Sequence, residues 1–416
     1  MALSRELKLF CRPHRPCRFI AGLCLLLSSS VLPGADQRNG ILSLAASTSG
    51  PKTTWHKESV GPWGKLEYFP VTLEPPASHL WEALYDERSY WNFGNLEVAE
   101  ARPLLETLGL SKETLALIDS EGIWKKADGG LELEFGDRIV ESLTPENRTA
   151  LARWFRLNSN LFFTKTIINF EGGNFSFFEN GGVAPETLDL VKRYSFSRRN
   201  VLSLMDRPYI LRKLGENTAE KERFLRATFS TKALIVRLVM DGSVDLDSII
   251  QYWSCGELNT GFESILRGSQ ATEGLNKVDL VQILPPVPRR YLYGFTNLQD
   301  VSPNNTPDCF WTSVQFFRRQ VSPRLLDPVR LMHHIEGDFE RIETEDLQFG
   351  DLVCMFDEAD GGFLHSYVHI ADDIVFSKNG ASFARPYVLT LKSDMLSVYL
   401  DESRYRFEVY RRKFPE

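Results

Sequence analysis

The middle of the chain mixes helical and strand periodicities. Three apolar runs predict a buried strand, a helix and a further strand in that order: "ALIVRLVMD" at 233–241, "DLDSIIQYW" at 245–253 and "VDLVQILPP" at 278–286. Earlier helices are expected from Thr144, with Pro145 in the first turn, and around Glu186. This mixture predicts an α+β or α/β domain of unknown role over residues 76–292.

The last third of the chain has a different pattern. Thr306 is a suitable N-cap for a helix that runs to Arg319, and Phe310, Val314 and Phe317 form an apolar stripe on one side of it. Four short apolar segments after this helix read as strands, at 350–356, 364–372, 373–379 and 405–412. We therefore expect a second α+β domain over residues 293–416, in which a helix packs on a small antiparallel sheet.

The first 35 residues have the pattern of an export signal. Basic residues precede an apolar run from Phe19 to Leu27, which is too short for a stable membrane span. Cleavage is expected near Ala35, with Ala46 as a second candidate, and an uncleaved signal would be the chain's only membrane attachment. Residues 36–75 are rich in Ser, Thr, Gly and Pro, which predicts a linker.

Composition and charge narrow the classes of function. The chain is 43% hydrophobic and 25% charged, as is ordinary for soluble globular domains. Removal of residues 1–35 takes away five Lys or Arg and one Glu, so the net charge falls from −7 to −11. A chain this acidic is not expected to bind nucleic acid.

Cysteine is scarce outside the predicted signal. Cys255, Cys309 and Cys354 remain, and an odd number of cysteines in an exported chain leaves at least one thiol unpaired. A disulfide between Cys255 and Cys354 would leave Cys309 as that thiol, although spacing alone does not establish the pairing. Without such a bond, Cys354 reads as a core residue of a strand and Cys255 as a packing residue.

Cys309 is the strongest candidate for chemistry. It falls in the first turn of the predicted helix, after Pro307 and Asp308, where the backbone N–H groups and the helix dipole favour a thiolate. A thiolate is a nucleophile that attacks carbonyl carbons. The alternative is a thiol that fills a gap in the core, since free cysteine is among the most buried residue types.

Two histidines on one predicted strand could serve as the base. Strand alternation puts His365, Tyr367 and His369 on the same face. Because His365 and His369 are about 13 Å apart along a strand, only one of them can lie next to a given sulfur.

The order of short motifs identifies which histidine to choose. "DC" at a helix start, "GDLV" at 350–353 and "HSYVHIAD" at 365–372 resemble the NlpC-type cell-wall peptidases, bacterial members of the papain-like cysteine hydrolase superfamily. The resemblance covers only the last third of the chain. It implies a papain-like fold for residues 293–416, with Cys309 as the nucleophile and His365 as its base.

The resemblance also implies a third residue that orients the base. Its position in this chain is Ser377, and Asn379, two residues further on, points to the same face of the strand. We favour Asn379 as the third residue and keep Ser377 as the alternative. Asp308, Trp311 and Tyr367 are expected to contact the substrate. The family has small residues after the nucleophile, whereas Phe310 and Trp311 follow Cys309 here, so the substrate groove is expected to differ.

The function implied is an exported cysteine hydrolase that cleaves an amide bond in the stem peptides of peptidoglycan, in the periplasm or cell envelope of a bacterium. The sequence shows no CxxC or HExxH spacing, and we expect no metal or cofactor. Two alternatives stay open: an inactive envelope-binding module with the same fold, and an amidase or acyltransferase that acts on another substrate.

Overall fold

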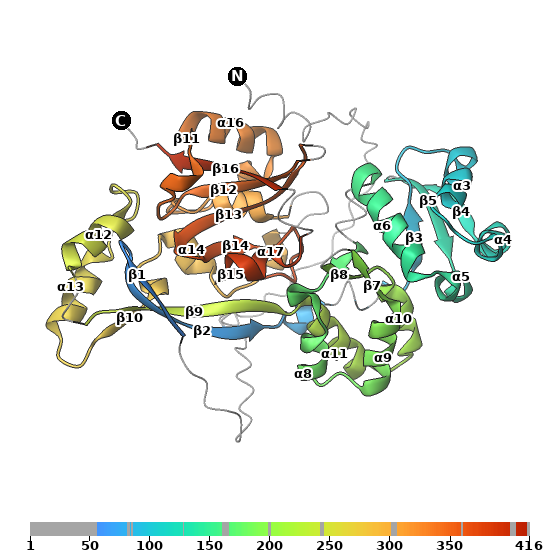
Figure 1. Ribbon diagram of the computed structural model, residues 1–416, viewed down its shortest axis with the longest axis horizontal. Coiled ribbons are helices and arrows are strands. Elements are labelled where there is room, and N and C mark those ends of the chain that lie inside the picture. Colours follow the sequence, from blue (N-terminus) through green and yellow to red (C-terminus); the bar gives the residue numbers. More distant parts are fainter. Residues whose placement is uncertain are drawn as a thin grey trace, which may run out of the picture.

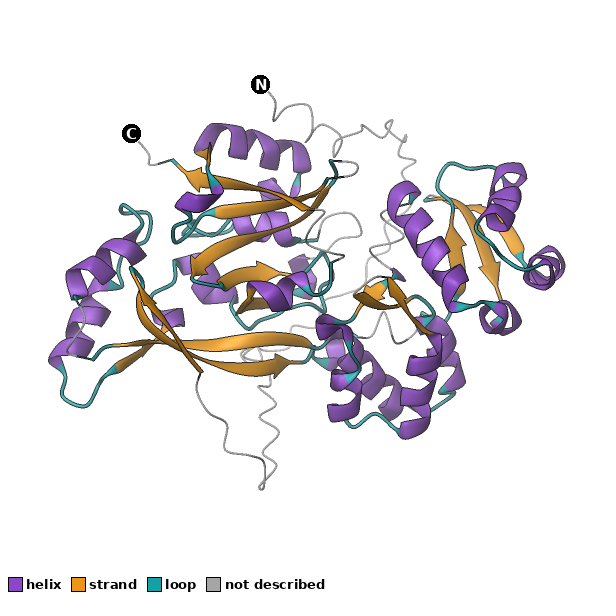
Figure 2. Cartoon of the chain, viewed as in Figure 1, coloured by secondary structure: helices purple, strands orange, loops and turns teal. Residues whose placement is uncertain are grey.

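The fold is a mixture of helices and small antiparallel sheets. The computed structural model describes residues 56–80, 84, 86–127, 129–159, 166–198, 201–241, 245–300, 306–358, 361–399 and 405–413. Within these residues the strands form four antiparallel sheets interleaved with helices, which confirms the predicted α+β class. Two parts are distinguished by their hydrophobic cores. The ribbon shows a helix-rich part and a sheet part (Figures 1 and 2).

The helix-rich part covers residues 77–229 and has a core of its own. Two small sheets, in the orders β3-β5-β4 and β6-β8-β7, are surrounded by helices. Its elements are β3 (Ser89–Asn92), α3 (Val98–Thr107), α4 (Lys112–Glu121), β4 (Ile123–Ala127), β5 (Gly130–Phe135), α5 (Asp137–Ser142), α6 (Pro145–Asn158), β6 (Ile168–Asn169), α8 (Ser176–Asn180), α9 (Pro185–Tyr194), β7 (Ser195–Arg198), β8 (Val201–Leu204), α10 (Arg207–Lys213) and α11 (Thr218–Phe229).

The sheet part comprises residues 56–73 and 231–413. A four-stranded sheet in the order β1-β2-β9-β10 lies beside a six-stranded sheet in the order β11-β16-β12-β13-β14-β15 (Figure 1). Its elements are β1 (His56–Gly61), β2 (Gly64–Leu73), β9 (Thr231–Val239), α12 (Leu246–Ser254), α13 (Glu263–Ala271), β10 (Lys277–Asp279), α14 (Pro286–Tyr291), α15 (Cys309–Val314), α16 (Pro328–Asp338), β11 (Phe339–Ile342), β12 (Leu352–Asp357), β13 (Phe363–Ala371), β14 (Ile374–Lys378), β15 (Tyr387–Leu391), α17 (Lys392–Leu396) and β16 (Tyr405–Arg412).

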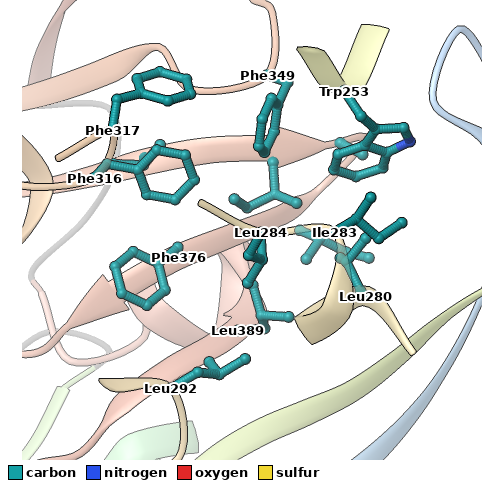
Figure 3. Packing of buried hydrophobic residues seen from close by; sticks show 14 of the residues in the cluster. Trp253, Leu280, Ile283, Leu284, Leu292, Phe316, Phe317, Phe349, Phe376 and Leu389 are labelled. Atoms are coloured by element: carbon teal, nitrogen blue, oxygen red, sulfur yellow. The ribbon is translucent and has the colours of Figure 1, made fainter. Parts of the chain in front are cut away.

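One hydrophobic core runs across the domain boundary predicted at residue 292. Trp253 and Leu284 lie in the same buried cluster as Phe349 and Phe376 (Figure 3). The ring centroids of Trp253 and Phe349 are 4.9 Å apart. Because a domain has its own core, residues 231–292 belong with the C-terminal sheet and not with a separate domain over 76–292. The change of core falls between α11 and β9.

The predicted linker over 36–75 is wrong where the structure describes it. Residues 56–73 form β1 and β2, and β2 pairs with β9 along nine residues from Lys65↔Val239 to Leu73↔Thr231. A strand paired on both sides in a sheet is an integral part of the fold and cannot act as a flexible arm. The predicted export signal and the first part of the linker lie outside the described residues.

Several local predictions are confirmed by hydrogen bonds. The Thr144 side chain accepts from the N–H of Asn147 and caps α6, and Pro145 is its first residue. The helix expected around Glu186 is α9, and the strand at 233–241 is β9. The strand predicted at 278–286 is wrong for most of its length. Only β10 is extended, and a 3-10 turn follows at Leu280–Gln282.

Polar side chains join the two parts. Arg385, on the loop between β14 and β15, donates to the carbonyl oxygens of Phe229 and Ser230 at the end of α11. The Arg156 guanidinium of α6 lies 2.6 Å from the Asp357 carboxylate at the end of β12. The helix-rich part is therefore attached along one side of the six-stranded sheet.

Candidate active site around Cys309 and His365

α15 carries Cys309 as its first residue. Asp308, not the predicted Thr306, is the N-cap, because its carboxylate accepts from the N–H of Trp311 at 2.8 Å. The helix ends at Val314, five residues before the predicted Arg319. The chain then turns, and the side chain of Gln315 bonds the backbone of Ser322. The predicted apolar stripe of Phe310, Val314 and Phe317 lies in the core as expected.

The Cys309 sulfur is buried beside groups of both charges. Cys309 is 6% exposed, and burial together with the Asp308 carboxylate raises the pKa of its thiol to about 12. The backbone N–H of Ser366 and the Lys378 ammonium lower that pKa but do not outweigh burial. The prediction that Cys309 is a thiolate is therefore wrong, because a thiol with this pKa keeps its proton at pH 7.

His365 lies on the face of the six-stranded sheet opposite to the face on which α15 packs. His365 pairs across the ladder with Met355, which packs in the cluster on the far face, whereas the hydroxyl of the next residue, Ser366, donates to Ser313 of α15. The predicted sharing of one face by His365 and Tyr367 is confirmed, because Tyr367 packs in the same far cluster.

The two strands next to the sulfur separate at this point. The β13–β14 ladder runs from Ala371↔Ile374 to Val368↔Phe376 and does not include Ser366 or Lys378. These two residues are the ones whose N–H and ammonium act on Cys309. The helix that carries Cys309 and the His365 imidazole therefore lie on different faces of the sheet, and the structure does not bring the predicted nucleophile and base into contact within the described residues.

Ser377 is the residue that bonds the imidazole. His365 Nε2 lies 2.9 Å from Ser377 Oγ, whereas the Asn379 Oδ1 accepts from the Tyr399 hydroxyl at 2.9 Å. Our preference for Asn379 as the third residue is wrong, and the alternative, Ser377, has the required contact. The ring of Tyr399 covers one side of the imidazole, with centroids 5.2 Å apart.

The second imidazole nitrogen is free within the described part of the chain. His365 is 0% exposed, and its Nδ1 is buried without a hydrogen-bond partner. No hydrogen bond therefore joins Nδ1 to the Cys309 sulfur in this structure. Burial lowers the pKa of His365 to about 3, so the ring is neutral at pH 7. An orphaned buried nitrogen is costly, and such atoms in native proteins call for an explanation.

The residues predicted to bind substrate are built into the fold. Trp311 is 5% exposed in the main core, and its Nε1 has no hydrogen-bond partner among the described residues. Tyr367 packs in the cluster on the far face, and Asp308 is committed to capping α15. Trp311 and Tyr367 are buried, so neither presents a surface for substrate as predicted, whereas Asp308 is half-buried and its predicted contact with substrate stays a prediction.

The remaining cysteines and histidines occupy structural places. Cys255, Cys309 and Cys354 are all free, so the suggested bond between Cys255 and Cys354 is absent. Cys354 is a core residue of β12, as predicted. His369 is buried four residues along β13 from His365, and burial lowers its pKa to about 4. His334 on α16 bonds Asp338 at 2.9 Å.

Lys378 and Tyr399 are near the site but were not anticipated from the sequence. The strand alternation of "DIVFSKN" could have indicated Lys378, because it puts this lysine on the core face with Phe376. Tyr399 follows α17, which no sequence pattern predicted. Over the described residues, no cluster of three His, Cys, Asp or Glu side chains could hold a metal, and no helix is both long and apolar enough to span a bilayer.

The chain was also compared with known proteins. No protein-family model, curated protein or solved structure matches it.

Proposed function

We propose that this protein is a cysteine hydrolase that cleaves amide bonds, with Cys309 as nucleophile, His365 as base and Ser377 as the residue that orients the base. The bond between His365 Nε2 and Ser377 Oγ carries the proposal, because among the described residues it leaves Nδ1 as a buried nitrogen without a hydrogen-bond partner. Since His365 lies on the sheet face opposite to α15, the proposal requires that the imidazole move to reach the sulfur. The backbone N–H of Ser366 lowers the pKa of the Cys309 thiol and would favour the thiolate that forms during attack. The roles proposed for the three residues are those of a papain-like site.

The reaction would start from a neutral pair. Burial raises the pKa of Cys309 and lowers that of His365, so the thiol keeps its proton and the imidazole has none to give. With Nε2–H donating to Ser377, the lone pair is on Nδ1, which is the state a general base requires. Nδ1 would take the thiol proton as sulfur attacks the carbonyl carbon.

The later steps follow from the same groups. The proton on Nδ1 would be transferred to the leaving amine as the C–N bond breaks, which leaves a thioester on Cys309. Water, deprotonated by the freed imidazole, would then attack the thioester carbonyl. The C–S bond breaks, the acid is released, and the proton on Nδ1 returns to the Cys309 sulfur. Proton and bond changes balance without any group other than water.

Peptidoglycan stem peptides are the proposed substrate class. The resemblance of "DC", "GDLV" and the His365 segment to NlpC-type peptidases supports this choice, and the predicted export signal is consistent with action in the cell envelope. The acidic chain favours a transient encounter with an anionic wall over tight static binding.

Hydrolysis of purified muropeptides tests the proposal. The full chain should release a new amine and acid pair, detected by chromatography and mass spectrometry, and Cys309→Ala and His365→Ala should each lower the rate by about 10³-fold or more. Cys255→Ser is the matched control, because this thiol lies elsewhere and should leave the rate unchanged. Equal cleavage by wild type and Cys309→Ala would refute the proposal.

A second candidate, an envelope-binding module without turnover, is favoured by the burial of both reacting groups. Its signature would be co-sedimentation of the full chain with peptidoglycan sacculi, unchanged by Cys309→Ala, together with the absence of any released product. Product release that depends on Cys309 would exclude this candidate.

A further inference from the structure

Lys378, the last residue of β14, carries a buried ammonium group. The residue is 0% exposed, and its Nζ donates to the carbonyl oxygens of Gly380 at 2.9 Å and Ser382 at 2.7 Å. It makes no ion pair with a carboxylate within the described residues. Burial of an unpaired lysine is unfavourable, and this cost lowers the pKa of Lys378 to about 7.

The groups that act on Lys378 come from three directions. The Asp308 carboxylate and the Cys309 sulfur of α15 favour its charged form, and Arg385 on the following loop opposes it. From β15, the ring centroid of Tyr387 lies 6.0 Å from Nζ. The pKa of the Cys309 thiol depends in turn on Asp308, Lys378 and the Ser366 N–H. The charge of the Cys309 thiolate raises the pKa of the Cys354 thiol and of the Tyr399 hydroxyl.

Lys378 and Asp308 therefore act on the sulfur with opposite signs. The ammonium favours the thiolate and the carboxylate favours the thiol. The hydrogen bonds to Gly380 and Ser382 fix the ammonium at the end of β14, on the strand face that Lys378 shares with Phe376 and against which α15 packs. A purely structural tie between β14 and its loop would not need a charge buried beside a cysteine.

We propose that Lys378 is the electrostatic partner of Cys309: its buried ammonium stabilises the thiolate that forms at the sulfur, and the Asp308 carboxylate destabilises that thiolate. This inference deepens the proposed function, on which it rests for the role of Cys309 as a nucleophile. Lys378 acts through the sulfur and is a positioning residue; His365 remains the group that takes the proton.

This pairing has a distinctive pH dependence. Below about pH 7 Lys378 is charged, and each further pH unit should raise the thiolate population tenfold. Above about pH 7 the lysine is neutral, and the ammonium–thiolate pair then has the same number of protons as the amine–thiol pair. Their ratio is independent of pH, so the reactivity of Cys309 should reach a plateau. The plateau ends where the thiolate forms beside the neutral amine.

Alkylation of the full chain with iodoacetamide, followed by peptide mapping, reads this out at Cys309, with Cys255 as internal reference. Wild type should show the plateau over about pH 7 to 9, whereas Lys378→Met should show a lower rate that rises tenfold per pH unit throughout. Lys378→Arg, which keeps a charge, should retain a higher rate than Lys378→Met. Asp308→Asn keeps an N-cap side chain and should raise the rate about tenfold.

The outcomes separate this inference from the proposed function, because alkylation requires no turnover. A wild-type plateau that persists in Lys378→Met, or rates that move in the same direction in Lys378→Met and Asp308→Asn, would overturn the role of Lys378. Thermal unfolding of each variant identifies a loss of fold. A plateau that depends on Lys378 would support it even if muropeptides are not cleaved, and that second result would refute only the hydrolase.

Discussion

The two parts of the molecule bury charge in different ways. In the helix-rich part, the Arg148 guanidinium donates to Asp206 at 2.6 Å and to the carbonyl oxygens of Leu143 and Val140, so the buried pair is satisfied within its own core. In the described residues of the sheet part, Lys378 is buried without an ion pair to a carboxylate and His365 Nδ1 has no hydrogen-bond partner. Full satisfaction is typical of a structural network, and the lack of it next to a thiol is typical of a site.

The largest expected change in stability is at Arg148, in the buried ion pair of the helix-rich part. Arg148→Met should lower the free energy of unfolding by about 3–5 kcal/mol, because Asp206 is left buried and unpaired. The double variant Arg148→Met/Asp206→Leu should recover much of the loss, since no charge is then buried alone. Chemical denaturation measures both. A double variant less stable than Arg148→Met would contradict the structural role.

An intermediate case lies between the two parts. Glu171 is buried, accepts from the Lys232 N–H at 2.7 Å and has Arg385 3.9 Å away, yet burial raises its pKa from 4.5 to about 7. The folded state thus binds this proton more tightly than the unfolded state, so the stability contributed here should rise as the pH falls from about 7 to 4.5.

The size of this effect should be at most about 3 kcal/mol, from the difference between the two pKa values. Glu171→Gln should remove that pH dependence and be more stable than wild type above pH 7. Denaturation at several pH values provides the measurement. An unchanged pH dependence in Glu171→Gln would show that this carboxyl does not hold its proton more tightly in the folded state.

The smallest expected effect is at Ser377. Ser377→Ala removes the acceptor of the His365 Nε2–H and should lower kcat on muropeptides about 10- to 100-fold with little change in KM, because the hydroxyl orients the base and does not contact substrate. Asn379→Ala is the matched control and should affect kcat less, since Asn379 bonds Tyr399. A larger loss in Asn379→Ala would restore Asn379 as the third residue.

Local sequence signals predicted the elements of the fold well but not how they assemble. The Thr144 cap of α6 and the strands β9, β13 and β16 follow from nearby residues alone. The boundary at residue 292 was wrong because Trp253 and Phe349 meet across about a hundred residues of chain, and apolar patterning does not say which runs share a core. The β1–β2 hairpin was missed because Gly, Ser and Pro around it outweighed its alternation.

The residue types of the candidate site were predictable from the sequence, but its electrostatics were not. The order of the Cys309 and His365 motifs is visible in the sequence, and so is Ser377 as an alternative third residue. The thiol's high pKa comes from burial by a sheet and a six-residue helix, which opposes the expected effect of the helix start. The proposed role of Lys378 could not be predicted, because it depends on the strand register and on the loop whose carbonyl oxygens accept its hydrogen bonds.

The most direct test of the central claim is to trap the thioester. The full chain mixed with muropeptide and quenched in acid should carry the acyl mass of the substrate on the peptide that contains Cys309, and Cys309→Ala should carry none. Product release with no acyl mass on Cys309 at any quench time, and undiminished by Cys309→Ala, would contradict the account.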